Sequence, residues 1–192
     1  MKYIKIDKFD TGNAHGIATV LWVSGCSHMC DGCHNPETWD CEYGKYFDEG
    51  AKEELLKAIM NEHVPNVVLS GGDPLFKKNV KDMEELVKEI KRWNPNKTII
   101  LYTGFTVKEI IRNHDYDRLR VLANVDYIID GKFEKDNKTK ILDLRGSYNQ
   151  QCYEVNAGAG GVIFKNRSLD YFKCHSFTDI EKEFEELYSK LR

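Results

Sequence analysis

The sequence predicts an α/β protein in which short buried strands alternate with amphipathic helices. Four apolar runs rich in Val, Ile and Leu lack polar alternation, which is typical of strands buried on both faces of a parallel sheet. The segments between them carry apolar residues at helical spacing. Repeated β–α units of this kind imply right-handed crossovers, and a closed eight-unit barrel usually takes about 250 residues. Because the chain has 192 residues, we expect a partial, open parallel β/α barrel of fewer than eight units.

The apolar runs place strands at residues 19–24, 67–70, 98–102 and 127–130, with a weaker strand at residues 140–144. Two helices are indicated by apolar side chains on one face, namely Leu55, Leu56 and Ile59 in the first and Met83, Leu86, Val87 and Ile90 in the second. Two further helices should begin at capping boxes, in which a glutamate follows a threonine by three residues: Thr106 with Glu109, and Thr178 with Glu181. We interpret all of these apolar faces as core.

Composition narrows the class of protein. A formal net charge of -3 offers no basic surface for nucleic acid or for an anionic membrane. No apolar run approaches transmembrane length and the first residues show no secretory signal, so we expect a cytoplasmic protein. The chain contains no internal repeat and no linker of biased composition. We therefore expect one domain over residues 1–192, in which residues 152–192 form a C-terminal extension of unassigned role.

Three of the six cysteines carry the strongest chemical signal. Cys26, Cys30 and Cys33 stand in the pattern C-x3-C-x2-C on a loop that leaves the first apolar strand. Thiolates are the ligands of iron–sulfur clusters, which normally take four of them. Three thiolates on one loop can hold three irons of a cubane and leave the fourth iron open to a small molecule. We interpret these three residues as the metal ligands of a [4Fe-4S] cluster.

A structural zinc site is the main alternative, with Cys41 or His34 as the fourth ligand. Zinc ribbons and fingers usually pair two cysteine knuckles that lie well apart in the sequence. Here no second knuckle exists, because Cys152 and Cys174 are isolated. The spacing therefore favours a cluster over zinc.

Polar motifs follow the next strands and should meet the cysteine loop at one rim, where parallel strands end. After the second strand comes the turn Gly71-Gly72-Asp73-Pro74, whose carbonyls or Asp73 carboxylate could accept hydrogen bonds from a ligand ammonium group. Taken alone, this motif is more typical of a plain turn. Thr103 ends the third strand and is a further candidate for binding a cofactor.

Two later motifs could reach the same rim. Asp130 and Lys132 follow the fourth strand and could bind a zwitterion, with Lys132 meeting its carboxylate, although a solvated turn suits this motif equally well. The polar segment at residues 145–150 comes after the weaker strand. It is either part of the rim or a surface loop.

In this order, the cysteine loop and the Gly-Gly-acid-Pro turn resemble the radical S-adenosylmethionine superfamily. The stretch at residues 23–39 (VSGCSHMCDGCHNPETW), with DGKF at 130–133 and RGSYNQ at 145–150, is similar to the activating proteins of anaerobic ribonucleoside-triphosphate reductases. The resemblance spans about residues 1–151. Three positions depart from the superfamily pattern: Ala18 replaces a common arginine, Gly32 an aromatic residue and Asp73 the usual glutamate.

The resemblance implies both the cofactors and the residues that bind them. Cys26, Cys30 and Cys33 would hold a [4Fe-4S] cluster whose open iron binds the amine and carboxylate of S-adenosylmethionine. The residues implied at the amine are Gly71, Gly72 and Asp73, and those implied at the carboxylate are Asp130 and Lys132.

The resemblance also implies the reaction and its partners. One electron splits S-adenosylmethionine into methionine and a 5′-deoxyadenosyl radical, which takes a hydrogen atom from a glycine of the partner protein. The implied partners are the large subunit of a glycyl-radical reductase and a one-electron donor such as flavodoxin or ferredoxin. Two alternatives stay open at this point: a radical S-adenosylmethionine enzyme that acts on a small molecule or peptide, and a non-catalytic interaction module stabilised by zinc.

Overall fold

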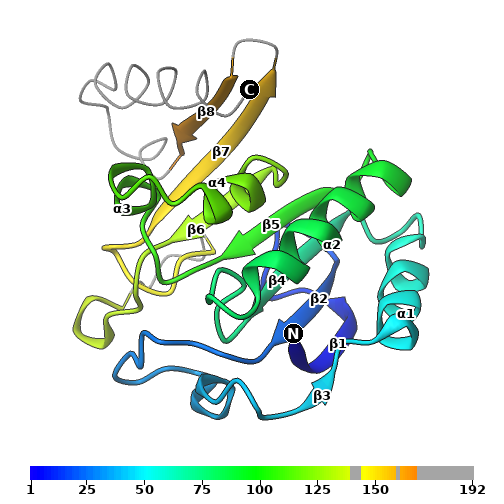
Figure 1. Ribbon diagram of the computed structural model, residues 1–192, viewed down its shortest axis with the longest axis horizontal. Coiled ribbons are helices and arrows are strands. Elements are labelled where there is room, and N and C mark those ends of the chain that lie inside the picture. Colours follow the sequence, from blue (N-terminus) through cyan, green and yellow to red (C-terminus); the bar gives the residue numbers. More distant parts are fainter. Residues whose placement is uncertain (139–143, 159–160, 168–192) are drawn as a thin grey trace.

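The computed structural model describes residues 1–138, 144–158 and 161–167, and within them eight strands form a mixed sheet (Figure 1). The strands are β1 (Lys2–Asp10), β2 (Ala18–Val23), β3 (Lys45–Tyr46), β4 (Asn66–Gly71), β5 (Thr98–Tyr102), β6 (Tyr127–Asp130), β7 (Gln151–Gly158) and β8 (Gly161–Asn166). The helices are α1 (Glu49–Ile59), α2 (Val80–Trp93), α3 (Val107–Arg112) and α4 (Tyr116–Leu122), with short 3-10 helices η1 (Pro36–Trp39) and η2 (Lys135–Asn137).

The strand order is β3-β1-β2-β4-β5-β6-β7-β8. The four strands expected from apolar runs are β2, β4, β5 and β6, and each is parallel to its neighbour in that order. Antiparallel strands extend this parallel centre on both sides, with β1 and β3 beyond β2 and with β7 and β8 beyond β6. The α/β alternation is thus present, while the closure of the sheet into a partial barrel stays a prediction.

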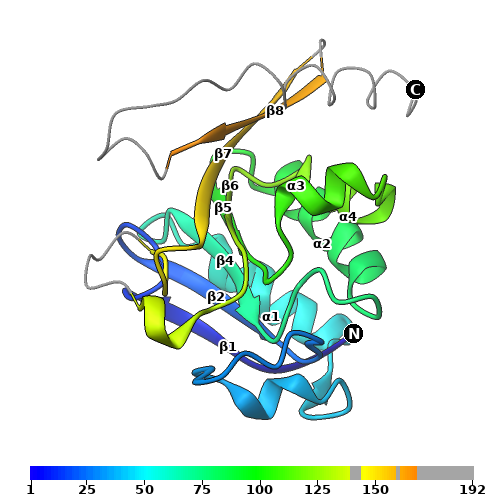
Figure 2. The ribbon, with the colours of Figure 1, turned by 90° about the vertical axis from the view of Figure 1, so that its left-hand side faces the viewer.

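Alternate strand residues point to the helices and form the larger part of the core. Leu21, Leu69, Leu101 and Ile128 are register partners across β2, β4, β5 and β6, and all four are fully buried. Figure 2 shows α1 to α4 on one side of the sheet. A smaller apolar cluster that includes Val20, Val68 and Ile100 lies on the other face. Both faces of the parallel strands are therefore buried, which explains their continuous apolar sequence.

The expected helices begin and pack as their sequences indicate. The predicted face of α2 is buried throughout, at Met83, Leu86, Val87 and Ile90. The capping box of α3 is formed, because Thr106 Oγ1 accepts a hydrogen bond from Glu109 N at 3.1 Å. In α1, Leu55 and Ile59 are buried and Leu56 is partly so. The capping box at Thr178 and residues 140–143 of the weaker strand lie outside the described residues.

The carboxyl ends of β2, β4, β5 and β6 lie at one edge of the sheet, because these strands run in the same direction. The cysteine loop, the Gly-Gly-Asp turn, Thr103 and the Asp130 loop follow these four ends in turn. The fold therefore brings the predicted motifs to a common edge. Among the residues that the structure describes, no helix is both long enough and apolar enough to span a membrane.

Candidate functional site

The cysteine loop, residues 24–39, leaves β2 at a sharp bend and is closed by its own backbone. Gly25 adopts a φ of 98°, a conformation that favours glycine. Its N–H donates to the carbonyl of Thr38 at 2.7 Å, and Cys26 N donates to the carbonyl of Trp39 at 3.2 Å. Pro36 opens η1 just before these acceptors. The two ends of the loop are thus held together, and the three cysteines project from the segment between them.

The three thiols are half-buried and free of disulfides. Burial is the main cause that raises the pKa of Cys26 to about 11; the nearby Asp73 carboxylate acts in the same direction, and a hydrogen bond from the backbone N–H of His28 acts against it. Burial also raises the pKa of Cys30, which a hydrogen bond from the backbone N–H of Phe133 and the positive charge of Lys132 oppose. Because a thiol must lose its proton to bind a metal, cluster assembly should release protons at this loop.

The chemistry of these donors suits an iron–sulfur cluster. Cys30 lies within electrostatic reach of both Cys26 and Cys33, so the three sulfurs share one short segment. Within the described residues, however, no three His, Cys, Asp or Glu side chains stand close enough together to hold a metal ion. The loop brings the thiols to one short segment and would have to adjust to place all three around a cluster. Neither His34 nor Cys41 completes a tetrahedral zinc group among these residues.

The Gly-Gly-Asp turn presses directly against the start of the cysteine loop. Gly72 N donates to the carbonyl of Val23 at 2.7 Å, and Asp73 N donates to that of Gly25 at 2.8 Å. A methyl group on Gly72 would lie 2.6 Å from the Gly25 oxygen and 2.8 Å from the Thr38 oxygen. Gly71 adopts a φ of 106°. Here the two glycines permit one backbone to approach another, which accounts for the motif without a ligand.

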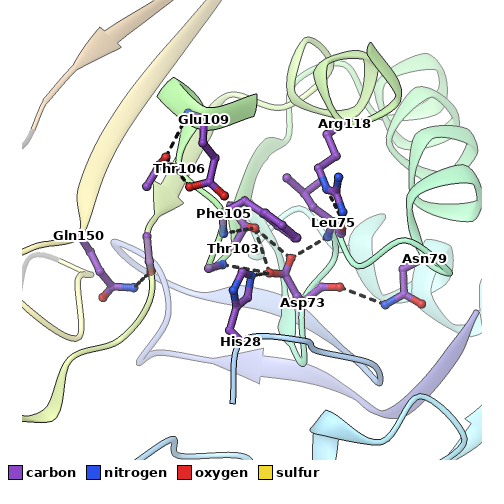
Figure 3. A network of polar contacts seen from close by, with 12 residues as sticks. His28, Asp73, Leu75, Asn79, Thr103, Phe105, Thr106, Glu109, Arg118 and Gln150 are labelled. Atoms are coloured by element: carbon purple, nitrogen blue, oxygen red, sulfur yellow. Dashed lines mark hydrogen bonds and ion pairs between the residues drawn. The ribbon is translucent and has the colours of Figure 1, made fainter. Parts of the chain in front are cut away.

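The Asp73 carboxylate joins three loops (Figure 3). It is 1% exposed. Its Oδ1 accepts hydrogen bonds from Leu75 N at 2.8 Å and from the Thr103 hydroxyl at 2.9 Å. Its Oδ2 lies 2.8 Å from His28 Nε2 and accepts from Gly104 N at 3.0 Å. Asp73 and Thr103, both predicted site residues, are thus brought together, and His28 links them to the cysteine loop.

The structure separates the two predicted residues of the Asp130 loop. The Asp130 carboxylate is buried and accepts hydrogen bonds from Val107 N at 2.7 Å and Gln151 N at 3.2 Å. Burial raises its pKa to about 6, although these two N–H groups favour the charged form. Lys132 is exposed on the side of Cys30. Lys132 therefore lies at the cysteine loop, whereas Asp130 points into the protein.

The segment at residues 145–150 folds onto the Asp130 loop. Gln150 Nε2 donates to the carbonyl of Gly131 at 2.7 Å, and Arg145 Nη1 donates to the carbonyl of Gln150 at 3.1 Å. Ser147 is buried, and its hydroxyl accepts from Glu134 N at 3.1 Å. The segment therefore contacts the Asp130 loop, while its part in the site stays a prediction.

Comparisons with known proteins match most of the chain. Residues 12–153 match the family described as a 4Fe-4S single cluster domain. A protein of Enterobacteria phage T4 is 37% identical over 158 residues, which are 82% of this chain and 97% of the relative. Similar relatives are found in Pasteurella multocida (35% identity, 80% and 97% coverage) and Escherichia coli K12 (34%, 81% and 99%). All three are named anaerobic ribonucleoside-triphosphate reductase-activating protein. The chain belongs to this family.

The family expected from the cysteine loop and the later motifs is thereby confirmed. The matched 4Fe-4S region contains all of the candidate site, from the cysteine loop through the Gly-Gly-Asp turn to the Asp130 loop and residues 145–150. Residues 154–192 of this reductase-activating-protein homologue lie beyond that region. The predicted iron–sulfur character therefore agrees with the family match, while the individual ligands stay predictions.

Two side chains at the centre of this family member's site were not predicted from the sequence. One is His28, whose ring packs edge-on against Phe105 at 4.5 Å between centroids. The other is Asn79, whose Nδ2 donates to the carbonyls of Ser24 at 2.8 Å and Asp73 at 3.0 Å. The place of His28 between two cysteines was a usable signal, whereas Asn79 stands in an ordinary position before α2.

Proposed function

We propose that this chain is an activase that cleaves S-adenosylmethionine reductively at a [4Fe-4S] cluster and installs a glycyl radical on an anaerobic ribonucleoside-triphosphate reductase. The observation that carries the proposal is the 37% identity to a reductase-activating protein over 97% of that protein's length. The C-x3-C-x2-C loop within the matched 4Fe-4S region supports it from the chemistry of the chain itself.

In this proposal, Cys26, Cys30 and Cys33 ligate the cluster and leave one iron for the cosubstrate. When bound, the cluster supplies one electron that breaks the bond between sulfur and the 5′ carbon of S-adenosylmethionine, and that carbon then takes a hydrogen atom from a glycine Cα of the reductase. The half-burial of the thiols supports this assignment, because it limits the access of water and oxygen to the sulfurs.

The remaining candidate residues hold the cosubstrate or the loops around it. At the turn of Gly71, Gly72 and Asp73, the main-chain carbonyl oxygens are the acceptors offered to the amine, because the Asp73 carboxylate already accepts hydrogen bonds from four groups. The exposed ammonium group of Lys132 beside Cys30 suits the carboxylate end. For Thr103 and Asp130, the observed contacts favour a positioning role. Thr103 holds Asp73, and Asp130 fixes the start of α3 and of β7.

The substrate in this proposal is a loop of another protein, so the cysteine loop must be open to a macromolecule. Met29, between the second cysteine and His28, is 65% exposed, which supports such access. A one-electron donor protein such as flavodoxin or ferredoxin would reduce the cluster. The net charge of -3 gives no reason to expect nucleic acid as a direct partner.

The test uses chain that has been reconstituted with iron and sulfide without air. After reduction with dithionite it should convert S-adenosylmethionine to methionine and 5′-deoxyadenosine. When it is mixed with the anaerobic reductase of the same organism, electron paramagnetic resonance should show the doublet of a glycyl radical. The Cys30→Ala variant is the negative control. Cleavage without a doublet on the reductase would contradict the activase and favour a related enzyme with a small-molecule or peptide substrate.

A further inference from the structure

The side chain of His28 extends from the cysteine loop to the end of β5 and fills a slot beside Gly104 and Phe105 (Figure 3). Its side chain is 7% exposed, and its ring packs edge-on against Phe105. A methyl group on Gly104 would lie 2.2 Å from the imidazole Cδ2. Gly104 does not have a left-handed backbone conformation, so the backbone does not require glycine at this position. Glycine is needed because a side chain would collide with the imidazole. The slot exists because residue 104 is glycine.

The imidazole also completes the hydrogen bonds of the Asp73 carboxylate. A carboxylate offers about four lone-pair positions and only accepts hydrogen bonds, so the Nε2 of His28 donates. Leu75 N and the Thr103 hydroxyl occupy Oδ1, while Gly104 N and His28 Nε2 occupy Oδ2. Leu75 N, the Thr103 hydroxyl and Gly104 N come from the turn after β4 and the end of β5. His28 is therefore the residue of the cysteine loop that hydrogen-bonds to the Asp73 carboxylate.

The backbone next to His28 needs such a restraint. Met29 adopts a φ of 47°, in the left-handed region that L-residues other than glycine rarely enter. A conformation of this kind costs free energy and persists where the surrounding structure holds it. Met29 is itself mostly exposed, so its side chain supplies little of that restraint. The buried neighbour at position 28 is placed to supply it.

We propose that His28 is a positioning residue that anchors the segment between Cys26 and Cys30 to the Asp73 carboxylate and so sets the path of the cysteine loop. His28 itself touches neither the cluster nor the cosubstrate in this role. The consequence for cluster assembly rests on the proposed function, whereas the anchoring of the loop does not. The anchor also fills the fourth acceptor position of Asp73, which leaves the main-chain carbonyls of the turn for a ligand amine.

The anchor is tested by amide hydrogen exchange on the iron-free, reduced chain. In His28→Ala, amides of residues 27–34 should exchange about tenfold faster, because a hydrogen bond to a charged group is lost. His28→Gln retains a donor at similar reach and should stay near wild type. Gly104→Ala should expel the ring and match His28→Ala. The double variant should exchange no faster than His28→Ala alone, since the methyl group then enters an empty slot.

Two controls separate loop release from other effects. His63→Ala removes an exposed histidine, and Gly12→Ala adds a methyl group where nothing lies within 4 Å, so both should behave as wild type. Amides of β5, read in the same experiment, should stay protected in all variants. Unchanged exchange in His28→Ala, or equal acceleration of the cysteine loop and β5, would overturn the anchor.

A second measurement follows the consequence for the site. After reconstitution, His28→Ala and Gly104→Ala should bind at least about threefold less iron and sulfide than wild type, and His28→Gln should recover most of the loss. Full iron binding in both variants would overturn the link between the anchor and the cluster. If wild type itself binds no iron and sulfide, the proposed function is wrong. The hydrogen-exchange experiment then remains the test of whether His28 anchors the cysteine loop.

Discussion

At the scale of single residues, the hydrogen bonds at the Asp73 carboxylate join side chains from distant parts of the chain. His28 and Asp73 are 45 positions apart, and Thr103 reaches Asp73 from 30 positions away. The three cysteines, in contrast, are close in sequence. This difference explains why spacing identified Cys26, Cys30 and Cys33 as candidate ligands, while the contact of His28 with Asp73 emerged only from the tertiary structure.

Replacement of one cysteine tests the predicted ligand set. Cys30→Ala removes the central thiol of the three and should abolish both cluster binding and cleavage of S-adenosylmethionine, since two remaining thiolates cannot hold a cubane in place. Cys174→Ala is the matched control and should retain both properties. Iron and sulfide analysis of the two variants after identical reconstitution provides the comparison. A cluster that survives in Cys30→Ala, or is lost in Cys174→Ala, would show that the ligands are misassigned.

Asp130 should make the stability of the iron-free chain depend on pH. Burial raises its pKa from 3.8 to about 6, so the folded state binds this proton more tightly than the unfolded state does. The free energy of unfolding should therefore fall as pH rises from about 4 to about 6, by at most about 3 kcal/mol from this group. Above that window the contribution is constant.

Urea unfolding of wild type and Asp130→Asn at pH 4.5 and pH 7 isolates this effect. The amide cannot titrate, so the variant should lack the part of the slope that Asp130 contributes. The variant also lacks one of the two oxygens that accept from Val107 N and Gln151 N, which lowers its stability at both pH values. This loss cancels when the change in stability between the two pH values is compared for the two proteins. A difference between the two proteins that stays the same at both pH values would contradict the raised pKa.

At the scale of elements, the parallel strands were predictable and the antiparallel ones were not. β2, β4, β5 and β6 are buried on both faces and show it as continuous apolar runs. β1 has the sequence KYIKIDKFD, in which lysines and aspartates obscure the pattern, and most of its residues are exposed or half-exposed. Strands such as β1 carry little apolar signal, because they bury only part of their surface.

The contact between the Gly-Gly-Asp turn and the cysteine loop gives a prediction at this scale. In Gly72→Ala the new methyl group would meet two backbone oxygens at 2.6 and 2.8 Å, so the turn and the loop must separate. We expect a loss of about 1–3 kcal/mol in unfolding free energy, measured with urea, together with weaker cluster assembly. Gly12→Ala should change stability by less than about 0.5 kcal/mol. Equal stability of the two variants would contradict the close packing.

At the scale of the whole molecule, parallel strand direction is what makes a site from separate motifs. The ends of β2, β4, β5 and β6 bring together residues that span from Cys26 to Lys132, and the 4Fe-4S family match covers this entire region. The α/β alternation and the family could be predicted because both depend on patterns within short segments, while the open parallel barrel stays a prediction. Two features could not be predicted: the inward orientation of Asp130 and the contacts of Asp73 with three loops. Both depend on how loops that are far apart in the sequence pack together at the edge of the sheet.

The central claim is that three cysteines of this chain hold an iron–sulfur cluster, and metal and sulfide analysis of protein purified without air tests it most directly. The account predicts about four iron and about four acid-labile sulfide per chain after reconstitution, with little zinc. One zinc per chain without iron or sulfide would contradict it and would favour a zinc-stabilised interaction module instead.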